Sequence, residues 1–456
     1  MPGYGEQRRR GMNTLMFGRA AHPVRCGRDL IIGGGEVFPE INFTLPPMSL
    51  DASTWPKAVE QYDQIAEMIV RAAKRLRLPG LVVEFELLPP MTEHPEWGAE
   101  ITRLLSGALR TAHNAGGLKS ALRVTPVDLR DGVRPPRLRS GPLWETMRRS
   151  FHLCADAGAD ILSIESVGGK EVHDEALLYG DIPGIIFALG VLAPRDMRFL
   201  WKEIVRICGE HKVVPGGDSA CGFANTAMQL ASQGMVPEVL AAVIRAASCV
   251  RSLVAMECGA VGPSKDCAYE GPVLKALTGI PISMEGKSAC CAHFSPVGNV
   301  AAAMCDLWSN ESVQNIRLLS GYAPEAFLEL LAYDCRLMNH ALTNNEEEMY
   351  QRMLVESDIR LSPQALILSP TSTLRIASAI RGEKDHYRKT VAAARAALGI
   401  IREAVSEQCL VLSNPEAAWL SKIGKGVDGL PDKEESLTGM MAGAYGPKFD
   451  PHSYGL

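Results

Sequence analysis

One carboxylate and several thiols stand directly after predicted β-strands, where a barrel or an open sheet would gather them. Glu165 ends the run ILSIE, Cys221 lies in the string GGDSACG, and Cys267 lies in the loop GPSKDCAYEG. Thiolates and carboxylates are ligands that zinc accepts, and a catalytic zinc site keeps one position open. The three groups therefore predict a zinc site at the ends of three strands. The competing thiols of the same region are Cys258, Cys290 and Cys291.

Other polar residues carry weaker signals. His173, in the acidic string KEVHDE, is interpreted as a surface or capping residue, and His293 as a residue that packs in a loop. Gly33-Gly34-Gly35 lacks the rest of a dinucleotide or phosphate-loop fingerprint and is interpreted as a tight turn. The basic stretch 130–139 (RDGVRPPRLR) is interpreted as a solvated loop because of its prolines. No HExxH string points to a metal site elsewhere.

Short β-branched runs alternate with longer amphipathic stretches through the first two-thirds of the chain. Helices are expected over residues 58–77, 98–115, 143–157, 194–209 and 236–248. Strands are expected over residues 29–32, 81–86, 120–125, 161–165, 185–189, 213–217, 252–257 and 281–285. This alternation predicts parallel strands joined by crossover helices. Eight strands in about 280 residues favour a TIM (β/α)8 barrel over a doubly wound open sheet.

The pattern changes near residue 310, after which helices follow one another without intervening strands. We expect an N-terminal extension (1–28), a TIM-barrel catalytic domain (29–310) and a C-terminal helical extension packed on the barrel (311–456). Met12 offers an alternative start, which would make residues 1–11 expendable.

The composition is that of an ordinary soluble globular protein, with 46% hydrophobic and 22% charged residues. Lys and Arg (47) against Asp and Glu (52) leave a net charge of −5, which argues against an electrostatic nucleic-acid binder. The apolar run 184–193 is shorter than the roughly 18 residues of a membrane span, and the N-terminus lacks a secretory apolar region. We therefore expect a cytoplasmic protein whose twelve cysteines form no disulfides.

Six strings along the chain closely resemble those of one enzyme family. They are SIESVGGKEVHDEALL (163–178), GGDSACGFANTAM (216–228), GAVGPSKDCAYEGP (259–272), MEGKSA (284–289), CDLWSNESVQN (305–315) and YDCRLMN (333–339). The family is the zinc-dependent methanol:corrinoid protein methyltransferases, the methanol-activating (MtaB-like) subunit of methanogens and acetogens. The resemblance runs from about residue 14 to the C-terminus, and strings of this length are highly specific.

The resemblance implies a TIM barrel that holds one catalytic Zn²⁺ through a glutamate and two cysteines. In this sequence they are Glu165 in SIES, Cys221 in GDSAC and Cys267 in SKDC. Cys258 departs from the pattern and adds a nearby thiol, although the SKDC context favours Cys267. The implied activity is that of a methanol–corrinoid protein Co-methyltransferase, in which Co(I) of a corrinoid takes the methyl group of methanol and becomes methyl-Co(III).

Methanol is a poor methyl donor because its leaving group is hydroxide. Zinc can act as a Lewis acid on the alcohol oxygen, and a proton donor should assist it because thiolate ligands soften that acidity. Residues expected as proton donors or orienting groups are Asp218, Asp266, Glu257 and Glu285. Asn225 is expected either to position the alcohol or to cap a helix.

The chain lacks the DxHxxG string with which corrinoid-binding modules ligate cobalt, since Asp385-His386 has neither the spacing nor the glycine. The resemblance therefore implies that a separate, cognate corrinoid protein carries the corrinoid and docks over the barrel mouth. It also implies a homodimer of the methyltransferase within a heterotetramer. The final methyl acceptor, a thiol or a pterin, stays open.

Three other functions stay open at this point. The same zinc and corrinoid chemistry would serve a methoxylated aromatic or another methyl donor. A zinc hydrolase on the same barrel is disfavoured because none of the ten histidines forms a ligand-like cluster in the sequence. A non-catalytic reactivator of a corrinoid protein would need no zinc ligands.

Overall fold

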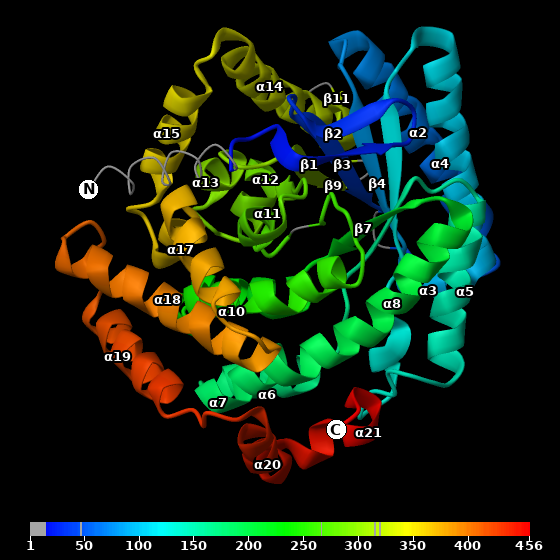
Figure 1. Cartoon of the computed structure of the whole chain (residues 1–456). Helices are drawn as coiled ribbons and strands as arrows, with labels where there is room; N and C mark the ends of the chain where they lie inside the picture. Colours follow the sequence, from blue (N-terminus) through cyan, green and yellow to red (C-terminus); the bar gives the residue numbers. More distant parts are fainter. Residues whose placement is uncertain (1–14, 46–47, 266, 314–315, 319–320) are drawn as a thin grey trace.

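The computed structural model describes residues 15–45, 48–265, 267–313, 316–318 and 321–456. Within them, parallel strands form a curled seven-stranded sheet in the order β7-β6-β5-β4-β3-β9-β8 (Figure 1). The strands are β3 (Phe38–Thr44), β4 (Leu81–Glu86), β5 (Ser120–Thr125), β6 (Ile161–Ile164), β7 (Val214–Asp218), β8 (Ser283–Glu285) and β9 (Leu307–Val313).

Backbone hydrogen bonds through residues 261–264 join the two edge strands of this sheet. Val261 N donates to Pro215 O of β7 at 3.0 Å, and Ser283 N of β8 donates to Ser264 O at 3.0 Å. The segment thereby occupies the place of an eighth strand between β7 and β8. The expected TIM barrel is confirmed.

Amphipathic helices surround the sheet. The longer ones are α2 (Trp55–Leu76), α4 (Pro95–Gly116), α5 (Pro142–Asp156), α8 (Ala193–His211) and α10 (Glu238–Glu257), and they confirm the five helices expected in the first part of the chain. On α2, buried Ile65, Ile69, Ala72 and Leu76 recur at helical spacing and face the core. Shorter helices are α3 (Pro89–Glu93), α6 (Lys170–Tyr179), α7 (Ile182–Phe187), α9 (Thr226–Ser232), α11 (Gly271–Thr278), α12 (Lys287–Ala292) and α13 (Gly298–Ala302).

Two runs expected as strands, 185–189 and 252–257, are helical. The first belongs to α7 and to the π-helical turn Ala188–Leu192, and the second is the C-terminal end of α10. Helix α18 (His386–Ser406) packs against both segments, so they are covered on the outside as well as on the barrel side. A helix buried all round is apolar all round, and a short apolar run does not distinguish it from a buried strand.

Residues 29–32, expected as a barrel strand, belong instead to an antiparallel hairpin of β1 (Arg19–Cys26) and β2 (Leu30–Gly34). Arg28 N donates to Ser120 O at the start of β5 (2.7 Å), so the hairpin covers the amino-terminal ends of the barrel strands. Gly33 and Gly34, interpreted as part of a tight turn, belong to β2 instead, and only Gly35 follows the strand. Gly33 (79°) and Gly35 (117°) have the positive φ that glycine adopts readily.

The sequence pattern does not reveal β3 and β9, because polar side chains line their buried faces. Glu40 of β3 forms an ion pair with Arg123 of β5, with 2.6 Å between Oε1 and Nε, and both side chains are buried. Ser309 and Asn310 of β9 are buried as well. A barrel interior that is partly polar removes the apolar run by which a parallel strand is usually predicted.

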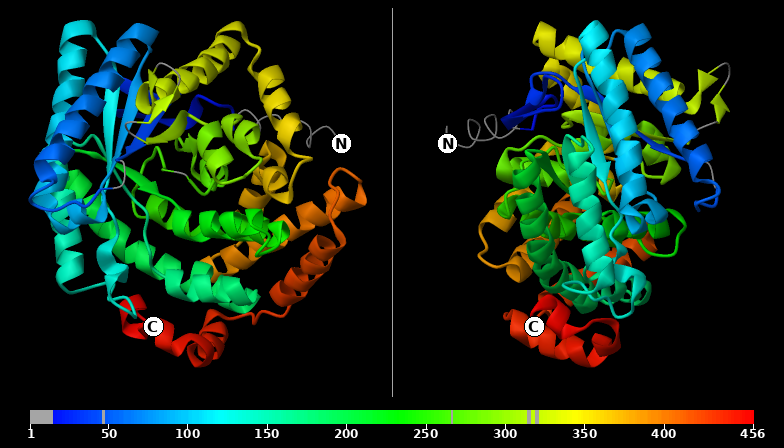
Figure 2. Two further views of the ribbon diagram at one scale, coloured as in Figure 1. Left: turned by 180° about the vertical axis from the view of Figure 1, so that it is seen from behind. Right: turned by 90° about the vertical axis from the view of Figure 1, so that its right-hand side faces the viewer.

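The expected C-terminal helical extension is present. Helix α14 (Ala323–Asn344) lies against α2, β3 and β9, and α18 packs on α10. The other C-terminal elements are the two-residue strands β10 (Arg317–Leu318) and β11 (Gly321–Tyr322), and helices α15 (Glu347–Asp358), α16 (Pro363–Leu368), α17 (Pro370–Arg381), α19 (Asn414–Asp428), α20 (Glu434–Tyr445) and α21 (Pro451–Tyr454). Both views of Figure 2 place the red terminal helices outside the green barrel segments. Strand β9 spans residue 310, and the division into three domains stays a prediction.

Helix α10 is apolar enough and long enough to cross a membrane, in contrast to the expectation that no run qualifies. It is the one helix of the described residues that meets this criterion, and 94% of its apolar window is buried inside the protein. Because the barrel and α18 cover it, its composition is that of a core helix.

Candidate metal centre

The structure brings together the three residues that the sequence singles out. Glu165 follows β6 directly, Cys221 follows β7, and Cys267 follows the closing segment 261–264. Their ligand atoms all lie within 4.8 Å of one another, and Cys267 Sγ is 3.4 Å from Glu165 Oε1. The ligands of a tetrahedral zinc lie about 3.5 Å apart, so small side-chain adjustments would suit one such ion.

The two thiols stand in surroundings that disfavour their anionic forms. Burial raises the pKa of Cys267 well above its ordinary value, and neighbouring Cys221 and Glu165 add to the rise. The hydrogen bond with Cys267 lowers the pKa of Cys221, but burial and Glu165 outweigh it and raise the pKa to about 11. Two thiolates and a carboxylate this close would repel one another, and a divalent cation is the partner that would offset the repulsion.

Neighbouring side chains hold the thiols in place. Ser219 Oγ lies 3.3 Å from Cys267 Sγ and accepts a hydrogen bond from Cys267 N. Asn225 Nδ2 donates to Cys221 Sγ at 3.5 Å across the π-helical turn Cys221–Asn225. The side chain of Asn225 makes no capping hydrogen bond to α9, so the interpretation as a helix cap is wrong.

The competing thiols lie apart from this cluster. Cys258 ends α10, and its Sγ is 3.9 Å from Arg198 O. Cys290 Sγ lies 2.6 Å from Tyr269 Oη, and Cys291 is exposed. In the part of the chain that the structure describes, none of these three belongs to a group of metal-ligating side chains, and all twelve cysteines are free.

Lys265 is a site residue that the sequence reasoning missed. Its buried ammonium lies 3.1 Å from Glu165 Oε1 and 3.2 Å from Glu84 Oε1, and it also pairs with Glu86. Two signals were available: its place two residues before Cys267, and the alternating glutamates of β4, which share one face of the strand. Lys265 orients Glu165 and compensates the carboxylates around it.

Two of the expected proton donors are committed elsewhere. Asp218 is fully buried and accepts hydrogen bonds from Arg251 and Trp201, both at 3.0 Å. Glu257 is not at a strand end, because it closes α10 and a barrel helix runs antiparallel to its strands. A hydrogen bond from His386 lowers the pKa of Glu257 to about 2. The assignment of Glu257 to the site is wrong, whereas an orienting role for Asp218, which accepts a hydrogen bond from Ser166 N (3.3 Å), stays a prediction.

Glu285 keeps its place among the expected donors. It ends β8, it is 6% exposed, and its charge raises the pKa values of both site thiols. His293, expected to pack in a loop, lies with Nδ1 3.8 Å from Glu285 Oε2. Asp266, the remaining expected donor, lies outside the described residues.

Two residues interpreted as surface groups are buried. His173 is fully covered within α6. Arg130 is also fully buried, and its guanidinium contacts Asp128 and Asp196, each at 2.7 Å. Since Asp128 Oδ2 accepts a hydrogen bond from Val167 N (3.0 Å), the Arg130 network anchors the loop that follows Glu165.

A cavity of ≈ 510 Å³ opens beside the cluster. Glu165 and Gly222, the neighbour of Cys221, belong to its wall, and Phe43, Tyr62 and Leu87 supply an apolar side. The volume lies within the range of small-molecule sites and exceeds what one methanol molecule fills. The cavity therefore has room for methanol together with part of a second reactant, or for a larger donor.

A TIM barrel that gathers two thiols and a carboxylate at the carboxyl ends of its strands has the architecture of a barrel enzyme with a candidate metal site. The model of the family described as methanol-cobalamin methyltransferase B subunit matches residues 4–455. The chain is a member of this family, and the resemblance seen in the sequence is confirmed.

Two relatives support this assignment. The methanol–corrinoid protein co-methyltransferase of Methanosarcina barkeri is 35% identical over 451 residues, which cover 97% of each chain. The crystal structure of the methanol:cobalamin methyltransferase complex MtaBC from Methanosarcina barkeri contains a chain that matches with a TM-score of 0.93. That match has 34% identity and covers 98% of each chain.

Proposed function

We propose that this chain is a methanol–corrinoid protein co-methyltransferase, which passes the methyl group of methanol to the cobalt of a separate corrinoid protein. The observation that carries the proposal is the convergence of Glu165, Cys221 and Cys267 in a chain that matches this family over residues 4–455. The name of the relative from Methanosarcina barkeri supports the reaction, and the MtaBC complex supports the partner. A cytoplasmic location is part of the proposal.

Glu165, Cys221 and Cys267 would hold one zinc ion. When bound, zinc supplies a Lewis acid that stabilises the negative charge developing on the departing oxygen of the alcohol. Lys265 keeps the Glu165 carboxylate oriented, and Asn225 donates to the Cys221 sulfur. These fixed contacts reduce the rearrangement needed when the ligands close on the ion.

We assign Glu285 as the proton donor of the reaction. It ends β8, its charge raises the pKa values of both thiols, and its side chain is buried. As the methyl carbon leaves its oxygen for cobalt, the Glu285 carboxyl would donate a proton to the hydroxide and release water. The carboxylate is then reprotonated from solvent before the next turnover.

The corrinoid would come from a partner that docks over the barrel mouth. The cavity beside Glu165 lies at this end of the barrel and offers a path to the site. A homodimer of this chain, each copy with one corrinoid protein in a heterotetramer, is part of the same proposal.

The test uses the purified, zinc-loaded protein with a Co(I) corrinoid protein or free cob(I)alamin under strict anaerobiosis. Methanol is added, and the visible spectrum is followed for methyl-Co(III). We expect zinc-dependent methylation, with zinc and activity lost together in Cys221→Ala and in Cys267→Ala. Cys258→Ala is the matched control and should keep both, because that thiol lies apart from the cluster.

Each other outcome contradicts a different part of the proposal. Full activity with undiminished zinc in Cys267→Ala would remove the ligand assignment. Methylation by a methoxylated aromatic but not by methanol would leave the site and replace the substrate. Inactivity with every donor, at full zinc content, would favour a zinc-dependent hydrolase on the same barrel.

A further inference from the structure

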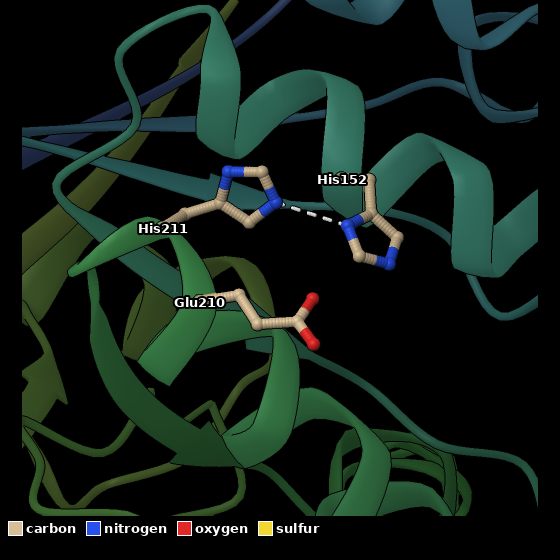
Figure 3. A group of neighbouring side chains, drawn as sticks. All are labelled: His152, Glu210 and His211. Atoms are coloured by element: carbon tan, nitrogen blue, oxygen red, sulfur yellow. Dashed lines mark hydrogen bonds between the residues drawn. The ribbon is translucent and has the colours of Figure 1, made fainter.

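A second group of metal-ligating side chains lies at the other end of the barrel. His152 comes from α5, whereas Glu210 and His211 are the last residues of α8 (Figure 3). Their ligand atoms all lie within 4.8 Å of one another. Both helices end here before the next strand begins, so the group stands at the amino-terminal ends of the strands. The length of a strand, about 15 Å, separates it from Glu165 and the site thiols. The sequence pattern did not indicate this cluster.

The carboxylate of Asp156 determines which nitrogen of His211 is available. His211 Nδ1 lies 2.8 Å from Asp156 Oδ1, so Nδ1 carries the proton and Nε2 keeps its lone pair. That Nε2 lies 2.9 Å from His152 Nδ1, the contact drawn as a dashed line in Figure 3. A carboxylate that holds one ring nitrogen while the other turns to a ligand position is the usual support of a metal-binding histidine.

The charge and the exposure of the group suit an ion that arrives from solvent. His152 and His211 supply two imidazoles, which bind a metal in their neutral form, and Glu210 supplies a carboxylate. The side chain of His211 is 17% exposed and that of Glu210 is 48% exposed, which leaves one side of the cluster open. Glu210 also pairs with Arg206, so its carboxylate is the weakest of the three ligands.

We propose that His152, His211 and Glu210 form a second site for a late first-row divalent metal ion such as Zn²⁺. Two nitrogens 2.9 Å apart subtend about 90° at a metal roughly 2.05 Å from each, and a tetrahedral angle needs only a few tenths of an ångström of ring movement. The ion replaces the hydrogen bond between the rings, and the His152 proton moves from Nδ1 to Nε2, so no charge is lost. Water completes the coordination, and the ion ties α5 to α8.

The test counts the metal that the whole protein retains. The protein is equilibrated with Zn²⁺ at micromolar free concentration and its bound zinc is measured by elemental analysis. We expect two equivalents for the wild-type protein and for the control His340→Ala, whose imidazole lies on α14. His152→Ala/His211→Ala should retain one equivalent, and Cys267→Ala should lose the other one. Asp156→Asn should bind the second zinc about tenfold more weakly.

Copper reports on the ligands themselves. Cu²⁺ is added to protein that carries one equivalent of zinc, held by Glu165, Cys221 and Cys267. Its electron paramagnetic resonance spectrum should show coupling to two imidazole nitrogens, and His211→Ala should reduce this number to one. Methyl transfer by the zinc-loaded His211→Ala variant, together with the thermal stability of its metal-free form, serves as the measure of intact folding. One equivalent of zinc in the wild-type protein, or two in the double histidine variant, would overturn the proposal.

Discussion

Replacing Lys265 by methionine tests how much its buried ion pairs stabilise the carboxyl-terminal end of the barrel. The ammonium of Lys265 is buried among Glu165, Glu84 and Glu86, and its removal would leave these carboxylates without their cation. Methionine keeps the length and most of the volume of the side chain, so packing changes little. We therefore expect a loss of stability that comes from the unpaired carboxylate charges.

The size of the expected loss in the free energy of unfolding depends on the protonation and the exposure of each carboxylate. Removing one partner of a buried ion pair costs about 3–5 kcal/mol, because the remaining charge stays buried. Glu84 softens the loss, since burial raises its pKa to about 7 and it takes up a proton easily near neutral pH. Burial also raises the pKa of Glu86, but Lys265 outweighs it and holds that pKa below its ordinary value. The Glu86 side chain keeps 32% exposure, so we expect a loss near the lower limit, about 3 kcal/mol.

The assay is urea denaturation at pH 7 after zinc has been removed by chelation, which isolates the ion pairs from metal binding. Lys265→Met/Glu86→Gln should recover about half of the loss, because the uncompensated charge is then gone. Lys287→Met is the control, since Lys287 forms an exposed pair with Asp334 and should matter by less than about 1 kcal/mol. A loss for Lys265→Met no larger than that of the control, or no recovery in the double variant, would refute the reasoning.

Three further outcomes are expected. Glu257→Gln should lower the free energy of unfolding by about 1 kcal/mol at pH 7, after allowance for solvent screening of its ion pairs. Because the folded-state pKa of Glu257 is lowered to about 2, this contribution should fade as the pH falls from 4.5 toward 2, and a pH-independent difference in urea midpoints would contradict it. Asn225→Ala should weaken zinc binding about tenfold in a chelator competition, since the donor to Cys221 is lost, and unchanged affinity would remove that role. Arg130→Met should lower the free energy of unfolding by about 3–5 kcal/mol because two buried aspartates lose their cation, and a loss below about 1 kcal/mol would count against the network.

The local hydrophobic pattern of the sequence was sufficient to predict the helices and strands that have one apolar face. Helices such as α2 and α4 present a stripe to the sheet, and β4 and β5 are β-branched runs between polar turns. The same pattern did not predict a helix that is covered on both faces, as in α10. It also did not predict a strand whose polar residues face the interior, as in β3. In each failure the environment that selects the residues comes from distant parts of the chain.

The candidate metal centre was also predicted in part from the sequence and decided in part by the tertiary structure. The chemical types of Glu165, Cys221 and Cys267, and their positions after strands, are properties of the sequence, because parallel strands in a barrel deliver such residues to one end. Tertiary structure alone decided that Cys258 stands apart, since a thiol at the end of a barrel helix points to the other end of the molecule.

The sequence by itself thus determined the fold class, the family and the ligand types of the proposed site. Only the tertiary structure placed Lys265 between its glutamates, buried Arg130 and brought His152 to His211. The physical reason is that these contacts join residues on different elements. Their distances depend on strand register and helix packing, which no short window of sequence contains.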